Sequence, residues 1–85
     1  MKQFNFTITD EIGMHARPAG LLVKLVKGFE STVTVEKNGN KIDATRLIAL
    51  MGLGIKKGDT VTIEADGADE DEAIQKLSEF FNENL

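Results

Sequence analysis

The sequence contains no cysteine, tryptophan or tyrosine, and its only histidine and only proline, His15 and Pro18, lie in one short segment. Without cysteine the chain has no disulfide, no thiolate zinc site and no cysteine nucleophile, and it suits a reducing compartment. Long apolar runs are also absent, so we expect no direct insertion into a membrane. The first ten residues alternate apolar and polar side chains and lack the apolar core of a signal peptide. We therefore expect a cytoplasmic protein.

The chain is short and acidic. Its 85 residues allow one hydrophobic core, so we expect a single domain spanning residues 1–85. It carries 14 acidic and 10 basic residues, a net charge of −4, and this balance argues against nucleic acid as a partner because phosphate backbones are held by surplus Lys and Arg. The acidic residues concentrate in the stretch 66–72, whereas most basic residues lie in the first two thirds of the chain. A local basic surface is therefore compatible with the negative total.

Alternation of apolar and polar residues predicts four strands. Phe4–Ile8 has this pattern, as do Thr32–Lys37 and Thr60–Ala65. Asn38-Gly39 supplies the preferred residues of a two-residue hairpin turn, after which Lys41–Asp43 returns as the partner strand.

Helical spacing of apolar residues predicts three helices. The first covers residues 16–27, with Leu21, Leu22, Leu25 and Val26 as its apolar positions and Gly28 as a left-handed C-terminal cap. The second is a short helix within residues 45–54, capped by Thr45, with more apolar residues than one buried face requires. The third begins at the acidic run 69–72, where carboxylates suit the positive end of the helix dipole, and its buried stripe contains Ala73, Ile74, Leu77, Phe80 and Phe81.

The order of these elements predicts the fold class. Strand, helix, two strands, short helix, strand and helix form an α+β open-faced sandwich, in which three helices cover one face of a four-stranded antiparallel sheet.

The segment GMHARPAG, residues 13–20, predicts a site for covalent phosphate chemistry. Pro18 suits the first turn of a helix, which places His15 at or just before the N-cap. The free backbone amides of that turn favour an anion, and the Arg17 guanidinium can grip phosphate oxygens in two places. Because neutral imidazole is an effective nucleophile, this arrangement suits a phosphohistidine. Taken alone, a single histidine beside a helix start is usually only a surface residue or a cap, so the segment by itself leaves both interpretations open.

Other site chemistries find little support in the sequence. A single histidine without cysteine lacks the partners for a zinc site, so we expect no metal. The glycines around Gly54 do not match nucleotide-binding spacings, and no cofactor motif is present. No base or pocket motif accompanies His15, so we expect no independent enzyme.

Three segments together resemble HPr, the histidine-containing phosphocarrier family of the bacterial sugar phosphotransferase system. They are the Gly13–Ala19 core, the apolar segment ending in Leu53-Gly54, and the stretch Ala65–Ile74. The order of strands and helices agrees as well, so the resemblance spans essentially the whole chain.

The resemblance implies a carrier that depends on partner enzymes for catalysis. His15 would be phosphorylated, through Nδ1 as in family members, by a phosphoryl group that comes from phosphoenolpyruvate through Enzyme I. That group would pass to the IIA domains of sugar permeases. Ala16 and Arg17 would hold the phosphate, and Pro18 would define the helix start. The resemblance also favours a monomer that makes transient contacts.

One face of the molecule would dock several partners, according to the same resemblance. It comprises nine residues: Gly20, Lys24, Lys27, Arg46, Leu47, Ile48, Met51, Gly54 and Lys56. An apolar patch ringed by cations is what a shared docking surface needs, and it accounts for the surplus apolar residues near Ile48. Leu50 and Leu53 are expected to belong to the core instead.

Two positions depart from the family pattern. Many Gram-positive HPr proteins have a regulatory serine where this chain has Arg46, so we expect that form of regulation to be absent. Ile12 replaces a polar residue that helps hold the phosphate in some members. The active-site segment is shared between branches of the family, so a regulatory paralogue and a carrier of the nitrogen-related branch remain alternatives.

Overall fold

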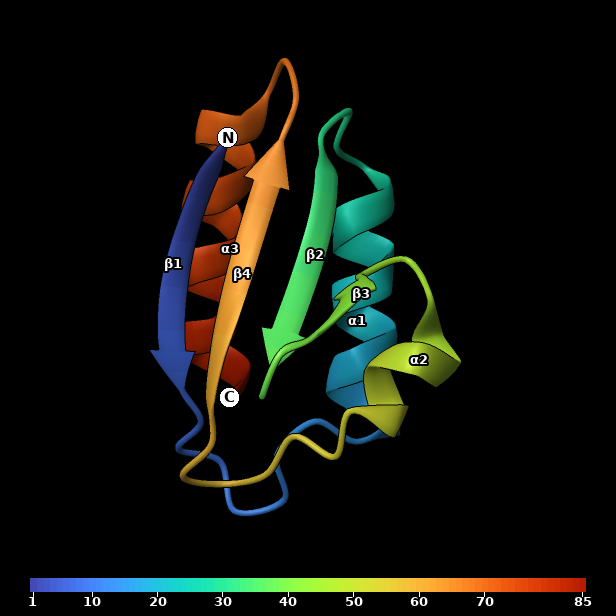
Figure 1. Ribbon diagram of the computed structural model, residues 1–85, viewed down its shortest axis with the longest axis vertical. Coiled ribbons are helices and arrows are strands. Elements are labelled where there is room, and N and C mark those ends of the chain that lie inside the picture. Colours follow the sequence, from blue (N-terminus) through green and yellow to red (C-terminus); the bar gives the residue numbers. More distant parts are fainter.

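The computed structural model describes residues 1–85, and its four strands form one antiparallel sheet flanked by three helices. The elements are β1 (Lys2–Thr7), α1 (Ala16–Lys27), β2 (Thr32–Lys37), β3 (Asn40–Asp43), α2 (Leu47–Gly52), β4 (Thr60–Asp66) and α3 (Glu70–Asn84). The strand order is β1-β4-β2-β3. Figure 1 shows α1 and α3 behind the sheet, with the short α2 beside α1 and β3. The predicted open-faced sandwich is confirmed.

The alternating strands bury one face of the sheet. Val33, Val35, Val61 and Ile63 are buried, and Val35 lies directly opposite Ile63 in the β2–β4 register. The side chains between them, such as Thr62, point to the open face and stay partly exposed. The helices cover the apolar face because each presents one apolar stripe to it, and burial of these side chains provides the main driving force for folding.

Aromatic contacts fasten α3 to the edge strand β1. The fully buried ring of Phe81 has its centre 5.5 Å from that of Phe6 and 6.0 Å from that of Phe4, both in edge-to-face geometry. Such pairs add to the stabilisation from burial alone. The predicted buried stripe of α3 is therefore confirmed at Phe81, as it is at Ala73 and Leu77.

The hairpin between β2 and β3 has the predicted two-residue turn. Asn38 and Gly39 have φ angles of 52° and 83°, so both lie in the left-handed region that a type I′ turn requires. The turn sets the register that pairs Lys37 with Asn40.

Two predicted helix caps are wrong. Gly28 has a right-handed backbone, φ −81°, because α1 ends in a tightened turn in which the Gly28 N–H donates to the Leu25 carbonyl at 3.1 Å. Thr45 does not cap α2, whose N-cap is Arg46. The Thr45 backbone N–H and hydroxyl both donate to the Asp43 carboxylate, at 2.8 and 2.7 Å, and they lower the pKa of Asp43 below its ordinary value.

Asp69 connects the start of α3 to the start of β2. Although it is the N-cap residue of α3, its side chain makes no cap hydrogen bond there. Its carboxylate accepts the backbone N–H groups of Glu30 and Ser31, both at 2.9 Å, and the Ser31 hydroxyl. Ser31 is buried, so this carboxylate satisfies polar groups that have little access to water.

Candidate functional site

His15 lies where the chain passes from a loop into α1. It is the N-cap residue, with extended backbone angles φ −112° and ψ −172°, and its carbonyl accepts the Ala19 N–H at 3.0 Å. The amides of Ala16 and Arg17 have no intrahelical partner, and the buried Pro18 has no N–H to satisfy. These donors and the positive end of the helix dipole favour an anion beside His15. The predicted N-cap position of His15 is confirmed.

The His15 ring faces the carbonyl oxygen of Gly13. Its Nδ1 atom lies 3.1 Å from that oxygen, to which the His15 backbone N–H also donates at 3.1 Å. A carbonyl oxygen only accepts hydrogen bonds, so Nδ1 carries a proton in this arrangement and the neutral ring has its lone pair on Nε2. Use of Nδ1 as a nucleophile therefore requires the ring to leave Gly13.

Backbone contacts hold the loop that precedes His15. Gly13 has φ +81°, and a Cβ atom there would lie 2.5 Å from the Ile55 carbonyl oxygen, so the position requires glycine. The same oxygen accepts the Met14 N–H at 3.0 Å. On the other side, the Asp10 carboxylate accepts the N–H groups of Ile12 and Gly13, each at 3.1 Å. The loop is therefore held at both ends.

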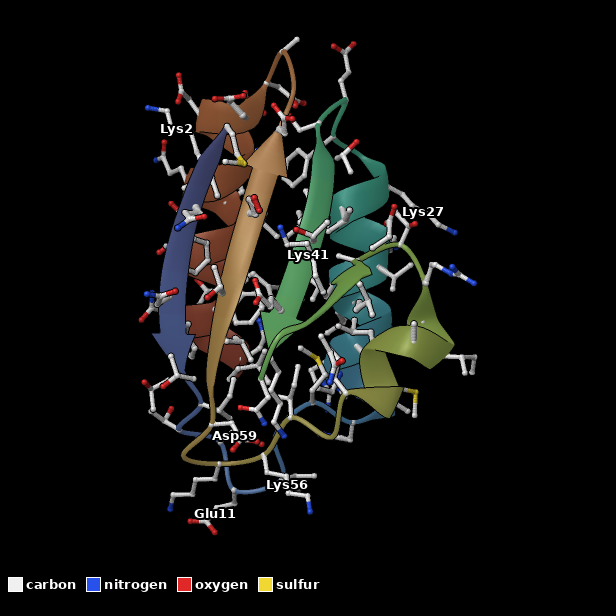
Figure 2. All side chains as sticks on the ribbon, in the orientation of Figure 1. Lys2, Glu11, Lys27, Lys41, Lys56 and Asp59 are labelled. Carbon is white, nitrogen blue, oxygen red and sulfur yellow. The ribbon has the colours of Figure 1, made fainter.

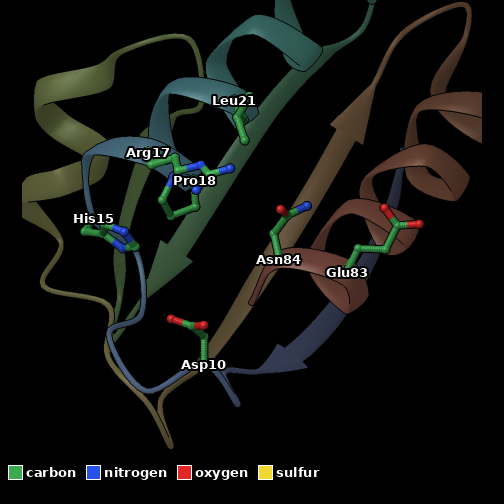
Figure 3. A pocket seen from close by; sticks show the side chains of 7 residues that line it. All are labelled: Asp10, His15, Arg17, Pro18, Leu21, Glu83 and Asn84. Atoms are coloured by element: carbon green, nitrogen blue, oxygen red, sulfur yellow. The ribbon is translucent and has the colours of Figure 1, made fainter.

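A polar cleft of about 290 Å³ opens between His15 and the end of α3, lined by Asp10, His15, Arg17, Pro18, Leu21, Glu83 and Asn84. Figure 3 shows Arg17 extended across Pro18, away from the His15 ring. Its guanidinium is exposed and forms no ion pair within the chain. Arg17 is therefore available to an external anion.

Sequence reasoning missed four residues of this cleft: Asp10, Leu21, Glu83 and Asn84. Asp10, Glu83 and Asn84 come from the loop after β1 and from the end of α3, which only the fold brings to His15. Asp10 had one local signal, since an Asp three residues before a glycine is typical of a side-chain-stabilised turn. Leu21 has helical spacing with buried neighbours, yet it is 45% exposed and lines the cleft.

The residues predicted to dock partners gather along α1, α2 and the segment after α2. We call this surface the α1–α2 face: Gly20, Lys24, Lys27, Arg46, Leu47, Ile48, Met51, Gly54 and Lys56. Ile48 is 80% exposed, and Leu47 and Met51 also reach solvent, whereas Leu50 on the opposite side of α2 is completely buried. The short helix thus presents apolar side chains in both directions, which accounts for its surplus of apolar residues.

The basic residues divide into two equal groups. Five form ion pairs with Asp or Glu carboxylates within the chain: Lys2, Lys37, Lys41, Lys57 and Lys76. The other five form none, and they are Arg17 and the four cations of the α1–α2 face. Figure 2 shows two of these, Lys27 and Lys56, pointing outward from the molecule. Arg17 and the α1–α2 face therefore carry the five basic side chains that form no ion pair within this acidic protein.

No three His, Asp or Glu side chains come together in a group that could hold a metal ion. None of the helices combines the length and the apolar character of a membrane span.

Comparison with known proteins agrees with this geometry. The family model for the HPr component phosphorylation site of the phosphotransferase system matches residues 2–83. The chain belongs to the HPr family. Members of this phosphocarrier family are carriers and not catalysts in their own right, and their open-faced sandwich is the fold found here.

Solved HPr structures are close matches over almost the whole chain. The histidine-containing phosphocarrier protein of Mycoplasma is 36% identical, with a TM-score of 0.92 over 96% of this chain and 93% of that one. HPr from Thermoanaerobacter tengcongensis is 38% identical, with a TM-score of 0.91 over 96% of this chain and 92% of that one. Crh, the catabolite repression HPr of Bacillus subtilis, was solved as a domain-swapped dimer and is 38% identical, with a TM-score of 0.78 over 100% of this chain and 98% of that one.

Proposed function

We propose that this HPr-family protein accepts a phosphoryl group on His15 from phospho-Enzyme I, ultimately from phosphoenolpyruvate, and passes it to the IIA domains of sugar permeases. The observation that carries the proposal is the meeting of three features at the start of α1. They are an imidazole at the N-cap, free backbone amides behind it, and the guanidinium of Arg17 without an ionic partner. Membership of the phosphocarrier family supports the same chemistry.

Transfer through Nδ1, which the family resemblance implies, requires two changes at His15. The ring leaves the Gly13 carbonyl, and its proton moves through solvent from Nδ1 to Nε2. The Nδ1 lone pair then forms the N–P bond while the bond between phosphorus and the donor breaks, and its electron pair stays on the donor. The phosphate oxygens come to lie near the Ala16 and Arg17 amides, and the Arg17 side chain turns toward them.

The site supplies a nucleophile and positive charge but little else. Phosphoryl transfer depends mainly on alignment of donor and acceptor and on neutralisation of the moving charge. In the cleft, Arg17 is the only cation, and the carboxylates of Asp10 and Glu83 add negative charge. We infer that the partner enzyme aligns the donor and that this protein is a carrier, without turnover of its own.

The α1–α2 face indicates the chemistry of the partners. It combines the exposed apolar side chain of Ile48 with four cations that form no ion pair within the chain. A partner surface with an apolar pocket and an acidic rim complements it, and the charges would accelerate association most strongly at low ionic strength. Enzyme I and the IIA domains would therefore present such surfaces in turn.

Regulation through a phosphoserine at the start of α2 is absent from this proposal. Arg46 has no hydroxyl, and the neighbouring Thr45 hydroxyl already donates to Asp43 at 2.7 Å. Arg46 forms no ion pair, so it adds positive charge to the α1–α2 face. A phosphoserine at this position would add negative charge instead.

A regulatory paralogue is the second candidate, because Crh is as similar in sequence to this chain, at 38% identity, as the HPr of Thermoanaerobacter tengcongensis. His15 together with Arg17 favours the carrier. We also propose a monomer, in which β1 pairs with β4 of its own chain as it does here. Size-exclusion chromatography with light scattering tests this, and a dimer at micromolar concentration would reject the monomer.

Intact-protein mass spectrometry tests the main proposal. The protein is incubated with phosphoenolpyruvate and a catalytic amount of Enzyme I, with His15→Ala as the control. We expect one phosphoryl adduct that is lost in acid, is absent from the control and is discharged by a IIA domain. A folded protein without the adduct, beside an Enzyme I that phosphorylates another HPr, would reject the carrier function and favour the regulatory paralogue. A specific response to the Enzyme I of a nitrogen-related system would assign the other branch.

A further inference from the structure

Lys37 forms the best-covered ion pair of the molecule, near the end of β2. Its Nζ atom lies 2.8 Å from Asp59 Oδ2 and donates to the Gly54 carbonyl oxygen at 2.6 Å. The two side chains are only 16% and 32% exposed, and every other ion pair has at least one partner that is about half exposed or more. A pair of this kind is screened less by water and salt than a surface pair.

The pair contacts the segment between α2 and β4 near both of its ends. Lys37 holds Gly54, near the start of the segment, and Asp59 holds its last part, because Asp59 Oδ2 also accepts the Lys56 N–H at 2.8 Å. Gly54 and Gly58 have φ angles of +66° and +91°, so glycine occurs at both ends of the segment. Because glycine allows many backbone conformations, contacts with side chains have more influence on the conformation of this segment.

This segment supports the loop that carries the phosphoryl acceptor. The carbonyl oxygen of Ile55 accepts the Met14 N–H at 3.0 Å, and it lies 2.5 Å from the position that a Gly13 Cβ would take. Gly13 in turn presents its carbonyl oxygen to His15 Nδ1 at 3.1 Å. A continuous series of contacts thus leads from Lys37 and Asp59 through Ile55 to the imidazole.

We propose that Lys37 and Asp59 are positioning residues for His15. They set the position of the Ile55 carbonyl, which sets the Gly13–His15 loop and with it the orientation and tautomer of the ring. The kinetic part of this inference rests on the proposed carrier function, and the part that concerns the ring does not. The hydrogen bond from Lys37 also lowers the pKa of the Asp59 carboxyl below its ordinary value.

The chain offers a matched control in Lys41. Its Nζ atom lies 2.9 Å from Glu64 on the open face of the sheet, and none of its hydrogen bonds reaches the segment 54–59. Lys37→Met and Lys41→Met therefore remove the same charge from the same sheet, and only the first touches the support of His15. Asp59→Asn tests the other partner, and Lys37→Arg keeps the charge and the donors.

The first readout uses the protein alone. In nitrogen-15 NMR spectra at neutral pH, we expect Lys37→Met and Asp59→Asn to shift the ring nitrogens of His15 and the Gly13 amide, and Lys37→Arg and Lys41→Met to leave both near their wild-type positions. Unchanged ring nitrogens in Lys37→Met, with thermal melting that shows a folded protein, would overturn the proposal.

The second readout is the rate of phosphoryl acceptance from phospho-Enzyme I under single-turnover conditions. We expect a loss of about tenfold for Lys37→Met and Asp59→Asn, since small misplacements of a reacting group have effects of this size. The double variant should lose no more than the worse single one, because the pair acts as a unit. Equal rates for Lys37→Met and Lys41→Met would overturn the kinetic claim. If the wild type accepts no phosphoryl group, the proposed function fails, and the NMR spectra alone decide whether Lys37 positions the ring.

Discussion

Replacement of Ile48 by alanine separates docking from folding on one short helix. Loss of three carbons from a fully buried side chain corresponds to about 2.4 kcal/mol, at roughly 0.8 kcal/mol for each CH₂ group. Ile48 is 80% exposed in the free protein, so only about a fifth of this, ~0.5 kcal/mol, is expressed in folding. If partners cover the side chain completely, the other ~1.9 kcal/mol appears as affinity, which is a roughly 20-fold weaker complex.

Leu50, two residues further along α2, provides the contrast. It is completely buried, so Leu50→Ala removes packing and leaves a cavity, at about 2–5 kcal/mol of folding free energy. In a domain of this size that lowers the melting temperature by roughly 10 °C or more, whereas Ile48→Ala lowers it by about 2–4 °C.

Isothermal titration calorimetry with Enzyme I measures the docking part. All proteins carry His15→Ala, so that no phosphoryl transfer occurs during the titration, and differential scanning calorimetry gives the melting temperatures. An affinity of the Ile48→Ala variant within twofold of the parent would refute the assignment of the α1–α2 face. A loss of stability as large as that of Leu50→Ala would show that Ile48 belongs to the core.

Three further predictions concern charge and backbone geometry. The hydrogen bond from the Ser31 hydroxyl, together with the backbone donors, holds the pKa of Asp69 below its ordinary value of 3.8. The charged carboxylate therefore stabilises the folded protein above pH 3.8, and this stabilisation is lost as the pH falls through the lower pKa of the folded state. Asp69→Asn should melt at a lower temperature at pH 7 and lose part of the acid dependence, and parallel curves for variant and wild type between pH 7 and pH 2 would contradict this. Arg46→Glu should slow phosphoryl transfer from Enzyme I, most strongly at low salt, and a rate unaffected by the substitution in stopped-flow experiments at two salt concentrations would exclude Arg46 from the docking face. Gly13→Ala should destabilise the fold by more than about 1 kcal/mol, since the new Cβ meets the Ile55 carbonyl and φ is positive; chemical denaturation measures this, and a neutral result would show that the loop before His15 can relax.

Local chemistry explains why much of the fold was predictable. The type I′ turn at Asn38-Gly39 depends on two residues that tolerate positive φ, so these two residues are enough to predict it. The start of α1 follows from Pro18 and from the periodicity behind it, which is why His15 was placed at the N-cap from sequence. Strand periodicity was equally informative, because a period of two leaves one face apolar wherever that strand lies in the sheet.

Competition between local options explains the errors. Thr45 has the chemistry of a helix cap, but the Asp43 carboxylate lies within reach of both its donors and takes them. Leu21 and Leu22 are adjacent and equally apolar, and only the direction from which the sheet approaches α1 buries one and exposes the other. The choice depends on packing, which periodicity alone resolves only to within about one residue.

The sequence by itself determined the elements, the turn and the location of the candidate nucleophile, because each depends on backbone preferences within a few neighbouring residues. Tertiary structure alone decided the strand order, the meeting of Asp10 and Glu83 with His15, and the contact of Lys37 with Asp59. It also decided which five basic residues form ion pairs and which five do not. These outcomes depend on distances between segments far apart in the chain, and such distances exist only once the helices have packed against the sheet.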